Sequence, residues 1–305
     1  MGKIAFVFPG QGAQSPGMGK SLYGNSPAAQ AVFSLADTLR PGTSDQCFSG
    51  TPEELSETQN TQPCMFACEL AAAAALTEMD ISPDMIAGFS LGEVAALTFS
   101  GAVSLEDGFR LVCQRGELMQ QDAEKVDSAM AAVLKLDNDA VASLCQQFPH
   151  VYPVNFNCPG QVTVACLKDE LADFSAAVKA AGGKALPLKV RGGFHCIFMA
   201  DAAAKFAKAL QGVDIAAPRL PLYSNYTARP YEGNYRRLLA EQIQNPVRWE
   251  DIIRDMVSQG ADTFFEVGPG NVLSGLIKKI APEARIFQAG DWDTLQAARK
   301  EFFSC

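Results

Sequence analysis

The sequence feature that most constrains the fold is a glycine-serine-glycine turn between a short apolar run and a helix-forming run. Residues 85–87 (Met-Ile-Ala) predict a buried strand, residues 88–92 (Gly-Phe-Ser-Leu-Gly) follow the pattern G-x-S-x-G, and Glu93 places an acid in the first turn of a helix. This order predicts a strained Ser90 whose hydroxyl stands clear of the sheet. Both glycines are required because a Cβ at either position would collide with the neighbouring strand or helix. Matches to G-x-S-x-G also arise by chance, but the flanking strand and helix favour a nucleophilic serine.

Composition and charge describe a globular chain with an acidic surface. The 305 residues are 48% hydrophobic and 19% charged, enough for one large domain or two unequal ones. The formal charge of 25 − 34 = −9 repels phosphate backbones, so we expect no nucleic-acid partner. Residues 1–4 lead directly into a strand without room for a signal peptide, and the apolar stretch 64–76 is interrupted by Glu69. We therefore expect a cytoplasmic protein with no membrane partner.

The nine cysteines fit a reducing compartment and do not predict a metal site. Nine is an odd number, no C-x-x-C pair occurs, and most of these residues have apolar or small neighbours, as buried thiols do. Cys64 and Cys68 lie one helical turn apart without a histidine or third cysteine beside them. The chain holds only two histidines, His150 and His195, so we expect no bound metal.

The middle of the chain predicts a small subdomain inserted into a larger one. Predicted strands cover 129–136, 151–156, 161–166 and 184–190, and predicted helices cover 137–147 and 168–181. This β-α-β-β-α-β order is the ferredoxin-like unit. Elsewhere strands alternate with helices, which indicates a mostly parallel sheet covered on both faces. We predict an α/β fold with a catalytic core at 1–125 and 195–305 and a ferredoxin-like subdomain at 126–194.

An arginine lies on a predicted helix that has one buried face. Ser104 and Asp107 resemble a capping box and predict a helix to about residue 122, with apolar residues at 109, 111, 112 and 118. Arg115 on this helix either pairs with an internal acid or binds an anionic ligand. Another long helix, rich in alanine, is expected to begin at 61–63 (Thr-Gln-Pro).

A nucleophilic serine needs a base and an oxyanion hole. His195 follows a predicted strand and a Gly-Gly pair, where its side chain can point into a cleft; His150 lies on a loop and is expected to be solvated. A purely structural role for His195 is the alternative. No acid ahead of His195 suits a triad, so a backbone or amide carbonyl is expected to orient it. The Leu91 N–H follows the serine, and the loop containing Gln11 is the candidate for the second donor.

Six short motifs occur in order along nearly the whole chain. They are 8–14 (Phe-Pro-Gly-Gln-Gly-Ala-Gln), 88–93 (Gly-Phe-Ser-Leu-Gly-Glu), 114–116 (Gln-Arg-Gly), 153–161 (Pro-Val-Asn-Phe-Asn-Cys-Pro-Gly-Gln), 245–249 (Asn-Pro-Val-Arg-Trp) and 266–270 (Glu-Val-Gly-Pro-Gly). Together they resemble the malonyl-CoA:acyl-carrier-protein transacylases of fatty-acid synthesis. The resemblance implies an α/β-hydrolase-like core with a ferredoxin-like subdomain. It also implies a monomer, without metal or other cofactor, that moves malonyl from malonyl-CoA to the phosphopantetheine thiol of acyl carrier protein.

The resemblance also implies a role for each site residue. Ser90 would be the acylated nucleophile and His195 its base, and the backbone N–H of Gln11 would join that of the residue after the serine in the oxyanion hole. The carbonyl of Gln242 would orient His195, which explains the missing acid. Arg115 would bind the malonyl carboxylate.

Two positions differ from the family pattern, and other functions share part of it. Phe89 replaces the usual histidine before the nucleophile, and Gly193-Phe194 precede His195; both are expected beside the acyl pocket. An acyltransferase serving a polyketide synthase would use the same chemistry with another carrier. A serine esterase or thioesterase would share the serine turn but would not need a buried Arg115. A non-catalytic binding module would tolerate loss of Ser90 and His195, so their joint presence argues against it.

The carrier protein is expected to dock on a local basic patch. Carriers of this kind are acidic, and so is this chain, so the two surfaces need local complementarity. The candidates are Lys184, Lys189, Arg191, Lys278 and Lys279, and the alternative is that these are ordinary solvated charges.

Overall fold

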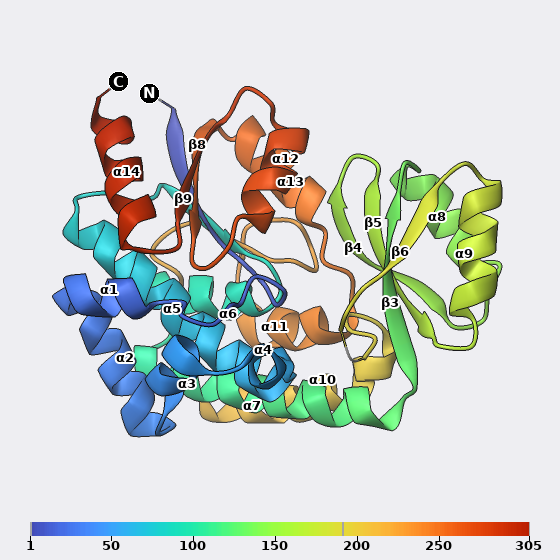
Figure 1. Cartoon of the computed structure of the whole chain (residues 1–305), viewed down its shortest axis with the longest axis horizontal. Coiled ribbons are helices and arrows are strands. Elements are labelled where there is room, and N and C mark those ends of the chain that lie inside the picture. The colour runs from blue at the N-terminus through green and yellow to red at the C-terminus, as the bar shows by residue number, and fades with distance from the viewer. Residues whose placement is uncertain (1, 191, 305) are drawn as a thin grey trace.

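The computed structural model describes residues 2–190 and 192–304, which form two sheets with their own helices (Figure 1). The larger sheet has the order β7-β2-β1-β8-β9, and all its pairings are parallel. Its strands are β1 (Lys3–Phe8), β2 (Met85–Gly88), β7 (Leu222–Tyr223), β8 (Ala261–Val267) and β9 (Arg285–Ala289). The smaller sheet is antiparallel, in the order β4-β5-β3-β6. Its strands are β3 (Ser128–Leu134), β4 (Val151–Cys158), β5 (Gln161–Leu167) and β6 (Lys184–Pro187). The predicted α/β class, with a mostly parallel sheet and a ferredoxin-like unit, is confirmed.

Helices cover both faces of the larger sheet and one face of the smaller. The first part of the chain contributes α1 (Lys20–Asn25), α2 (Pro27–Leu39), α3 (Thr43–Ser49), α4 (Pro52–Ser56), α5 (Thr58–Glu78), α6 (Leu91–Phe99) and α7 (Leu105–Lys125). Helices α8 (Asn138–Cys145) and α9 (Leu171–Ala180) lie on the face of the small sheet turned away from the core (Figure 1). The last part contributes α10 (Ala200–Ala209), α11 (Tyr235–Gln244), α12 (Trp249–Ser258), α13 (Val272–Ile280) and α14 (Trp292–Phe303), with 3-10 turns at Ile197–Met199 and Leu210–Gly212.

Strand β1 shows why the sheet must be covered on both sides. Its side chains alternate between two hydrophobic cores, as the period of two requires. Phe6 and Phe8 pack in the core that contains α5 and α7, whereas Ala5 and Val7 pack in the core that contains α12 and α13. The parallel register pairs Phe8 with Gly88. The loops that follow β1 and β2 therefore leave the sheet side by side, at the edge where parallel sheets bind ligands.

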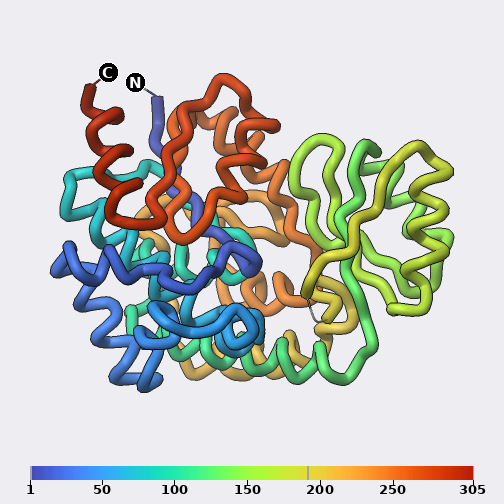
Figure 2. The backbone as a smooth tube through the Cα atoms, viewed as in Figure 1, coloured from blue at the N-terminus to red at the C-terminus, as the bar shows by residue number. Residues whose placement is uncertain are grey.

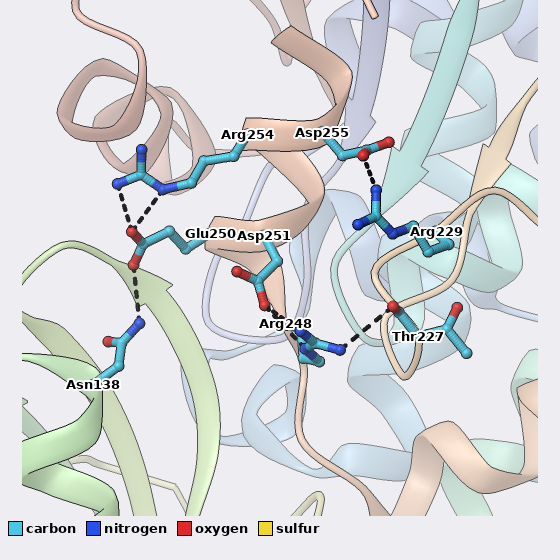
Figure 3. Close-up of polar contacts among 8 residues, drawn as sticks. All are labelled: Asn138, Thr227, Arg229, Arg248, Glu250, Asp251, Arg254 and Asp255. Carbon is cyan, nitrogen blue, oxygen red and sulfur yellow. Dashed lines mark hydrogen bonds and ion pairs between the residues drawn. The ribbon is translucent and has the colours of Figure 1, made fainter. Parts of the chain in front are cut away.

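The small subdomain is joined to the core by backbone as well as side-chain contacts. The Phe156 N–H donates to the Val247 carbonyl at 2.9 Å, and the Val247 N–H donates to the Val154 carbonyl at 2.9 Å. Figure 3 shows α12 beside this junction, where the Glu250 carboxylate accepts from Asn138 of α8 at 3.2 Å and from Arg254 of its own helix. The tube in Figure 2 leaves the core after α7 and returns before α10. The domain boundaries at 125/126 and 194/195 stay predictions.

Several helices differ from the sequence-based expectation: the short helices α1, α3 and α4 were not predicted, and two further differences concern α5 and α14. Helix α5 begins at Thr58, so Pro63 lies inside it rather than in its first turn. The reason is tertiary: the Thr58 N–H donates to the Gln120 side chain of α7 at 2.9 Å, a cap that local sequence does not reveal. Helix α14 was not predicted, although Asp291 and Thr294 form a capping box at its start.

Most cysteine thiols in the described part of the chain are buried, and none of its helices could cross a membrane. Eight cysteines lie in the described part, all as free thiols, and all but Cys113 are buried or nearly so, as predicted. Between residues 2 and 190 and between 192 and 304, no helix combines the length and apolar character needed to cross a membrane.

Candidate active site

Ser90 occupies the turn between β2 and α6 with a backbone conformation that few residues adopt. Its φ is 55° and its ψ is −108°. A Cβ on Gly88 would lie 1.9 Å from the Gly92 carbonyl carbon, and one on Gly92 would lie 2.3 Å from the Phe8 carbonyl oxygen. Both distances are far below van der Waals contact, so the predicted need for glycine at both positions is confirmed. The strained turn points to a functional role for the serine.

Asn225 holds the strained turn in place, and sequence reasoning missed it. Its side-chain carbonyl accepts from the Ser90 N–H at 2.7 Å, and its NH₂ donates to the Gly88 carbonyl at 2.6 Å. Asn225 follows β7, the strand beside β2. The only available signal was a polar residue after an adjacent strand of a parallel sheet.

Ser90 and His195 meet as a nucleophile and base do. The Ser90 Oγ lies 2.8 Å from His195 Nε2, and His195 Nδ1 lies 2.8 Å from the Gln242 carbonyl oxygen. Since Nδ1 donates to that carbonyl, Nε2 is left as the acceptor for the serine proton. His195 is only 4% exposed and has a φ of 61°. Burial, reinforced by the Arg115 charge, lowers the pKa of His195 to about 4, so the imidazole is neutral at pH 7.

Arg115 reaches the same serine from α7. It is 1% exposed, and its Nη2 donates to Ser90 Oγ at 3.1 Å and to the Gln242 side-chain oxygen at 2.7 Å. Its Nη1 donates to the Gln62 side-chain oxygen at 2.8 Å. Burial lowers the pKa of Arg115 to about 10, and the Glu93 charge opposes that shift, so the guanidinium stays charged. All three of these acceptors are uncharged, so hydrogen bonding to them does not neutralise the cation beside the serine.

The two expected oxyanion donors lie in one small cavity with the nucleophile. Gln11 and Leu91 line a cavity of about 100 Å³ together with Ser90 and His195. Leu91 is the first residue of α6, so its N–H has no intrahelical acceptor. Within 2–190 and 192–304, neither the Leu91 nor the Gln11 backbone N–H donates to a protein acceptor. Their role in binding an oxyanion stays a prediction, and the cavity is where it would operate.

A wider cavity of about 450 Å³ adjoins the small one at the junction of core and subdomain. The two share the lining residues Gln11, Phe89, Asn155, Leu188 and Val190. Phe89 also packs against Trp249, with ring centroids 5.5 Å apart, and Phe194 lines the small cavity. Both positions that differ from the family pattern therefore border the pocket, as expected. The shared lining lets a ligand whose reactive end meets Ser90 extend from the small cavity into the wider one.

His150, the second histidine, lies away from the Ser90 cavity, and its surroundings bear on the expected absence of a metal site. His150 is half-exposed and its Nδ1 lies 2.9 Å from the Glu170 carboxylate, so its predicted surface position is confirmed. Among the residues that the structure describes, no three histidine, cysteine or acidic side chains are grouped to bind a metal ion.

Comparison with known proteins adds independent information. A sequence model of the acyl transferase domain matches residues 5–288. The malonyl CoA-acyl carrier protein transacylase of Bacillus subtilis is 39% identical over 306 residues, which cover 98% of this chain and 96% of that protein. The solved malonyl CoA-acyl carrier protein transacylase from Clostridium perfringens has a TM-score of 0.96 and 32% identity, covering 99% and 98%. A malonyl-transacylase solved in complex with its type II PKS acyl-carrier protein has a TM-score of 0.94 and 34% identity, covering 98% and 99%.

Proposed function

The chain belongs to the acyl transferase domain family, as its motifs predicted, and from this membership we propose that it is a malonyl-CoA:acyl-carrier-protein transacylase. It would transfer malonyl from malonyl-CoA to the phosphopantetheine thiol of a carrier, without a metal or prosthetic group. We place it in the cytoplasm as a monomer. The observation that carries the proposal is the buried Arg115 cation, 3.1 Å from the Ser90 hydroxyl. An acyl group bearing a carboxylate suits this position, whereas a neutral acyl group leaves the cation without an anion in direct contact.

The first half-reaction loads Ser90. His195 Nε2 takes the hydroxyl proton as Oγ attacks the malonyl thioester carbonyl. The N–H groups of Leu91 and Gln11 would bind the resulting oxyanion. The C–S bond then breaks, His195 returns the proton to the CoA sulfur, and CoA leaves a malonyl ester on Ser90.

The second half-reaction reverses these steps with another thiol. The carrier thiol gives its proton to His195 and attacks the malonyl-Ser90 ester carbonyl. When the ester C–O bond breaks, His195 returns the proton to Ser90 Oγ. The Gln242 carbonyl keeps the imidazole in the required tautomer throughout, in the position that an aspartate occupies in serine proteases.

The test measures transfer to separately purified carriers. Incubation with radiolabelled malonyl-CoA and holo carriers from fatty-acid and polyketide systems should give labelled carrier with ping-pong kinetics. We propose that the fatty-acid carrier is preferred; preference for the polyketide carrier would select the alternative acyltransferase role. Release of free malonate without carrier labelling would identify an esterase or thioesterase instead.

The low pKa of His195 predicts an unusual acid limit for Ser90 loading. Imidazole at its ordinary pKa of about 6.5 would lose base activity below neutrality. Here kcat/KM for malonyl-CoA should stay level down to about pH 5 and fall as His195 protonates near pH 4. Stopped-flow loading in pH-jump format keeps the enzyme at low pH only briefly. An acid limb centred near about pH 6.5 would contradict the lowered pKa.

Carrier docking should depend on exposed lysines of the small subdomain and of α13, one of which lines the wider cavity. Lys189 lines that cavity and Lys184 is exposed on β6, while Lys278 and Lys279 are exposed on α13. Arg191 lies outside the described residues. Each of the four lysines changed to glutamate should slow transfer to the carrier by about three- to tenfold at low salt and spare loading from malonyl-CoA.

The matched control for docking is Lys300→Glu on α14, which lies at the opposite end of the molecule from the small subdomain (Figure 1). It carries the same change in net charge. Equal slowing of carrier transfer by Lys300→Glu and by the four docking variants, or equal slowing of both half-reactions in the docking variants, would refute local docking on these lysines.

A further inference from the structure

Glu93 is a fully buried carboxylate that no step of the proposed mechanism uses. It lies in the first turn of α6, three residues after Ser90. Its Oε2 accepts from the Asn225 backbone N–H at 3.0 Å and from Gln242 Nε2 at 2.9 Å, and its Oε1 accepts from the Tyr231 hydroxyl. Burial raises the pKa of Glu93 to about 7 against these hydrogen bonds and the Arg115 charge, which lower it. A group this costly to bury requires an explanation.

Gln242 connects Glu93 to Arg115 through the two ends of one amide. Its NH₂ donates to Glu93 Oε2 at 2.9 Å and to the Ser90 carbonyl at 2.8 Å, so both protons have acceptors. Its oxygen accepts from Arg115 Nη2 at 2.7 Å. A flipped amide would place its NH₂ against the guanidinium and its oxygen against two other oxygens. Oxygen atoms at Glu93 and Ser90 thus dictate which end of Gln242 faces Arg115.

We propose that Glu93 is a positioning residue for recognition of the acyl carboxylate, an inference that rests on the proposed function. Its Oε2 fixes the orientation of the Gln242 amide, and that amide holds the Arg115 guanidinium against Ser90, where the malonyl carboxylate arrives. The acceptor atom matters here rather than the charge, because Arg115 contacts the uncharged Gln242 and not Glu93 itself. Selectivity for malonyl over acetyl groups would therefore depend on Glu93, a residue that does not itself contact substrate.

Two substitutions at Glu93 separate the acceptor from the charge. Glu93→Gln can keep an oxygen toward Gln242 and Asn225 and place its NH₂ toward the Tyr231 hydroxyl, which can accept. Glu93→Met keeps the volume but removes the acceptor. The readout is the ratio of kcat/KM for malonyl-CoA to that for acetyl-CoA, with KM and kcat determined separately. Glu93→Met should lower this ratio by about tenfold or more, chiefly through the malonyl KM, and Glu93→Gln should keep it within about threefold.

Tyr231→Phe is the matched control, because it removes a buried hydrogen bond from the other oxygen of the same carboxylate. It should lower thermal stability and leave the malonyl-to-acetyl ratio unchanged. If Glu93→Met fails to fold, Gln242→Met takes its place, since it retains the main-chain carbonyl for His195 but loses the Arg115 acceptor. A reduced ratio in that variant supports the step from Gln242 to Arg115, and an unchanged ratio would overturn the proposal.

Several results would overturn the inference. The first is an unchanged malonyl-to-acetyl ratio in Glu93→Met, or in Gln242→Met if that variant is used instead. The others are a loss of this ratio in Glu93→Gln or in Tyr231→Phe as large as the loss in the methionine variant. They differ from failure of the proposed function, in which the unaltered protein would form no malonyl ester at all. In that case the inference would fall together with the function on which it rests.

Discussion

Replacing Arg115 by alanine is expected to lower kcat/KM for malonyl-CoA by about a hundredfold or more, while acetyl transfer holds or rises. The guanidinium is 1% exposed and has a planar fork that can donate two hydrogen bonds to a carboxylate. Without it, the malonyl carboxylate would be unpaired in a cavity of about 100 Å³, at a cost of about 3–5 kcal/mol. The acetyl group of acetyl-CoA has no carboxylate that could be left unpaired. Initial rates with both thioesters measure the difference.

Arg110→Ala provides the control on the same helix. Arg110 is 61% exposed and pairs with Glu106 on the surface of α7. The Arg110→Ala substitution should leave kcat/KM for both malonyl-CoA and acetyl-CoA unchanged, because exposed ion pairs contribute little to stability. An Arg115→Ala protein that slows both substrates equally, or that unfolds, would show that Arg115 supports the structure rather than the carboxylate.

Replacing Ser90 by alanine should lower malonyl transfer by about a thousandfold or more and leave the fold intact. The substitution removes a single oxygen and keeps the Cβ, so the turn held by Asn225 has no new collision. His195 Nε2 and Arg115 Nη2 lose their shared partner but still face the cavity. Transfer assays and the thermal midpoint check the two halves of this prediction.

Ser100→Ala is the matched substitution at the other end of α6. The Ser100 hydroxyl is buried and donates to the Leu97 carbonyl at 2.6 Å, far along the helix from the cavity. The Ser100→Ala substitution should lower the thermal midpoint and leave the rate of malonyl transfer unchanged. Transfer that survives in Ser90→Ala, or that is lost equally in Ser100→Ala, would remove Ser90 from the mechanism.

Much of the site could be predicted because its chemistry is encoded in short segments. The serine turn needs two glycines within five residues, so its geometry is local and Ser90 and Leu91 follow from it. His195 could be chosen because there was only one competing histidine. The loop containing Gln11 and the buried face around Arg115 were candidates from the residues alone, but the malonyl carboxylate as the Arg115 ligand and the role of Gln242 came from the resemblance, since nothing local distinguishes Gln242 from other polar residues.

The supporting residues could not be predicted, because their roles exist only in the folded chain. Asn225 and Glu93 are separated by more than a hundred residues and meet through tertiary packing. Gln62 was expected at a helix start, but it lies inside α5 and faces Arg115. Amide side chains can accept or donate at either end, so sequence alone does not say which groups they join.

The most direct test of the account follows a malonyl group through Ser90. Intact-protein mass spectrometry of the unaltered protein with malonyl-CoA should show one malonyl adduct, localised by peptide mapping to the peptide containing Ser90. Addition of holo carrier should discharge the adduct and produce malonyl carrier in equal amount. Malonylated carrier that appears without any adduct, or an adduct on another residue that persists in Ser90→Ala, would contradict the account.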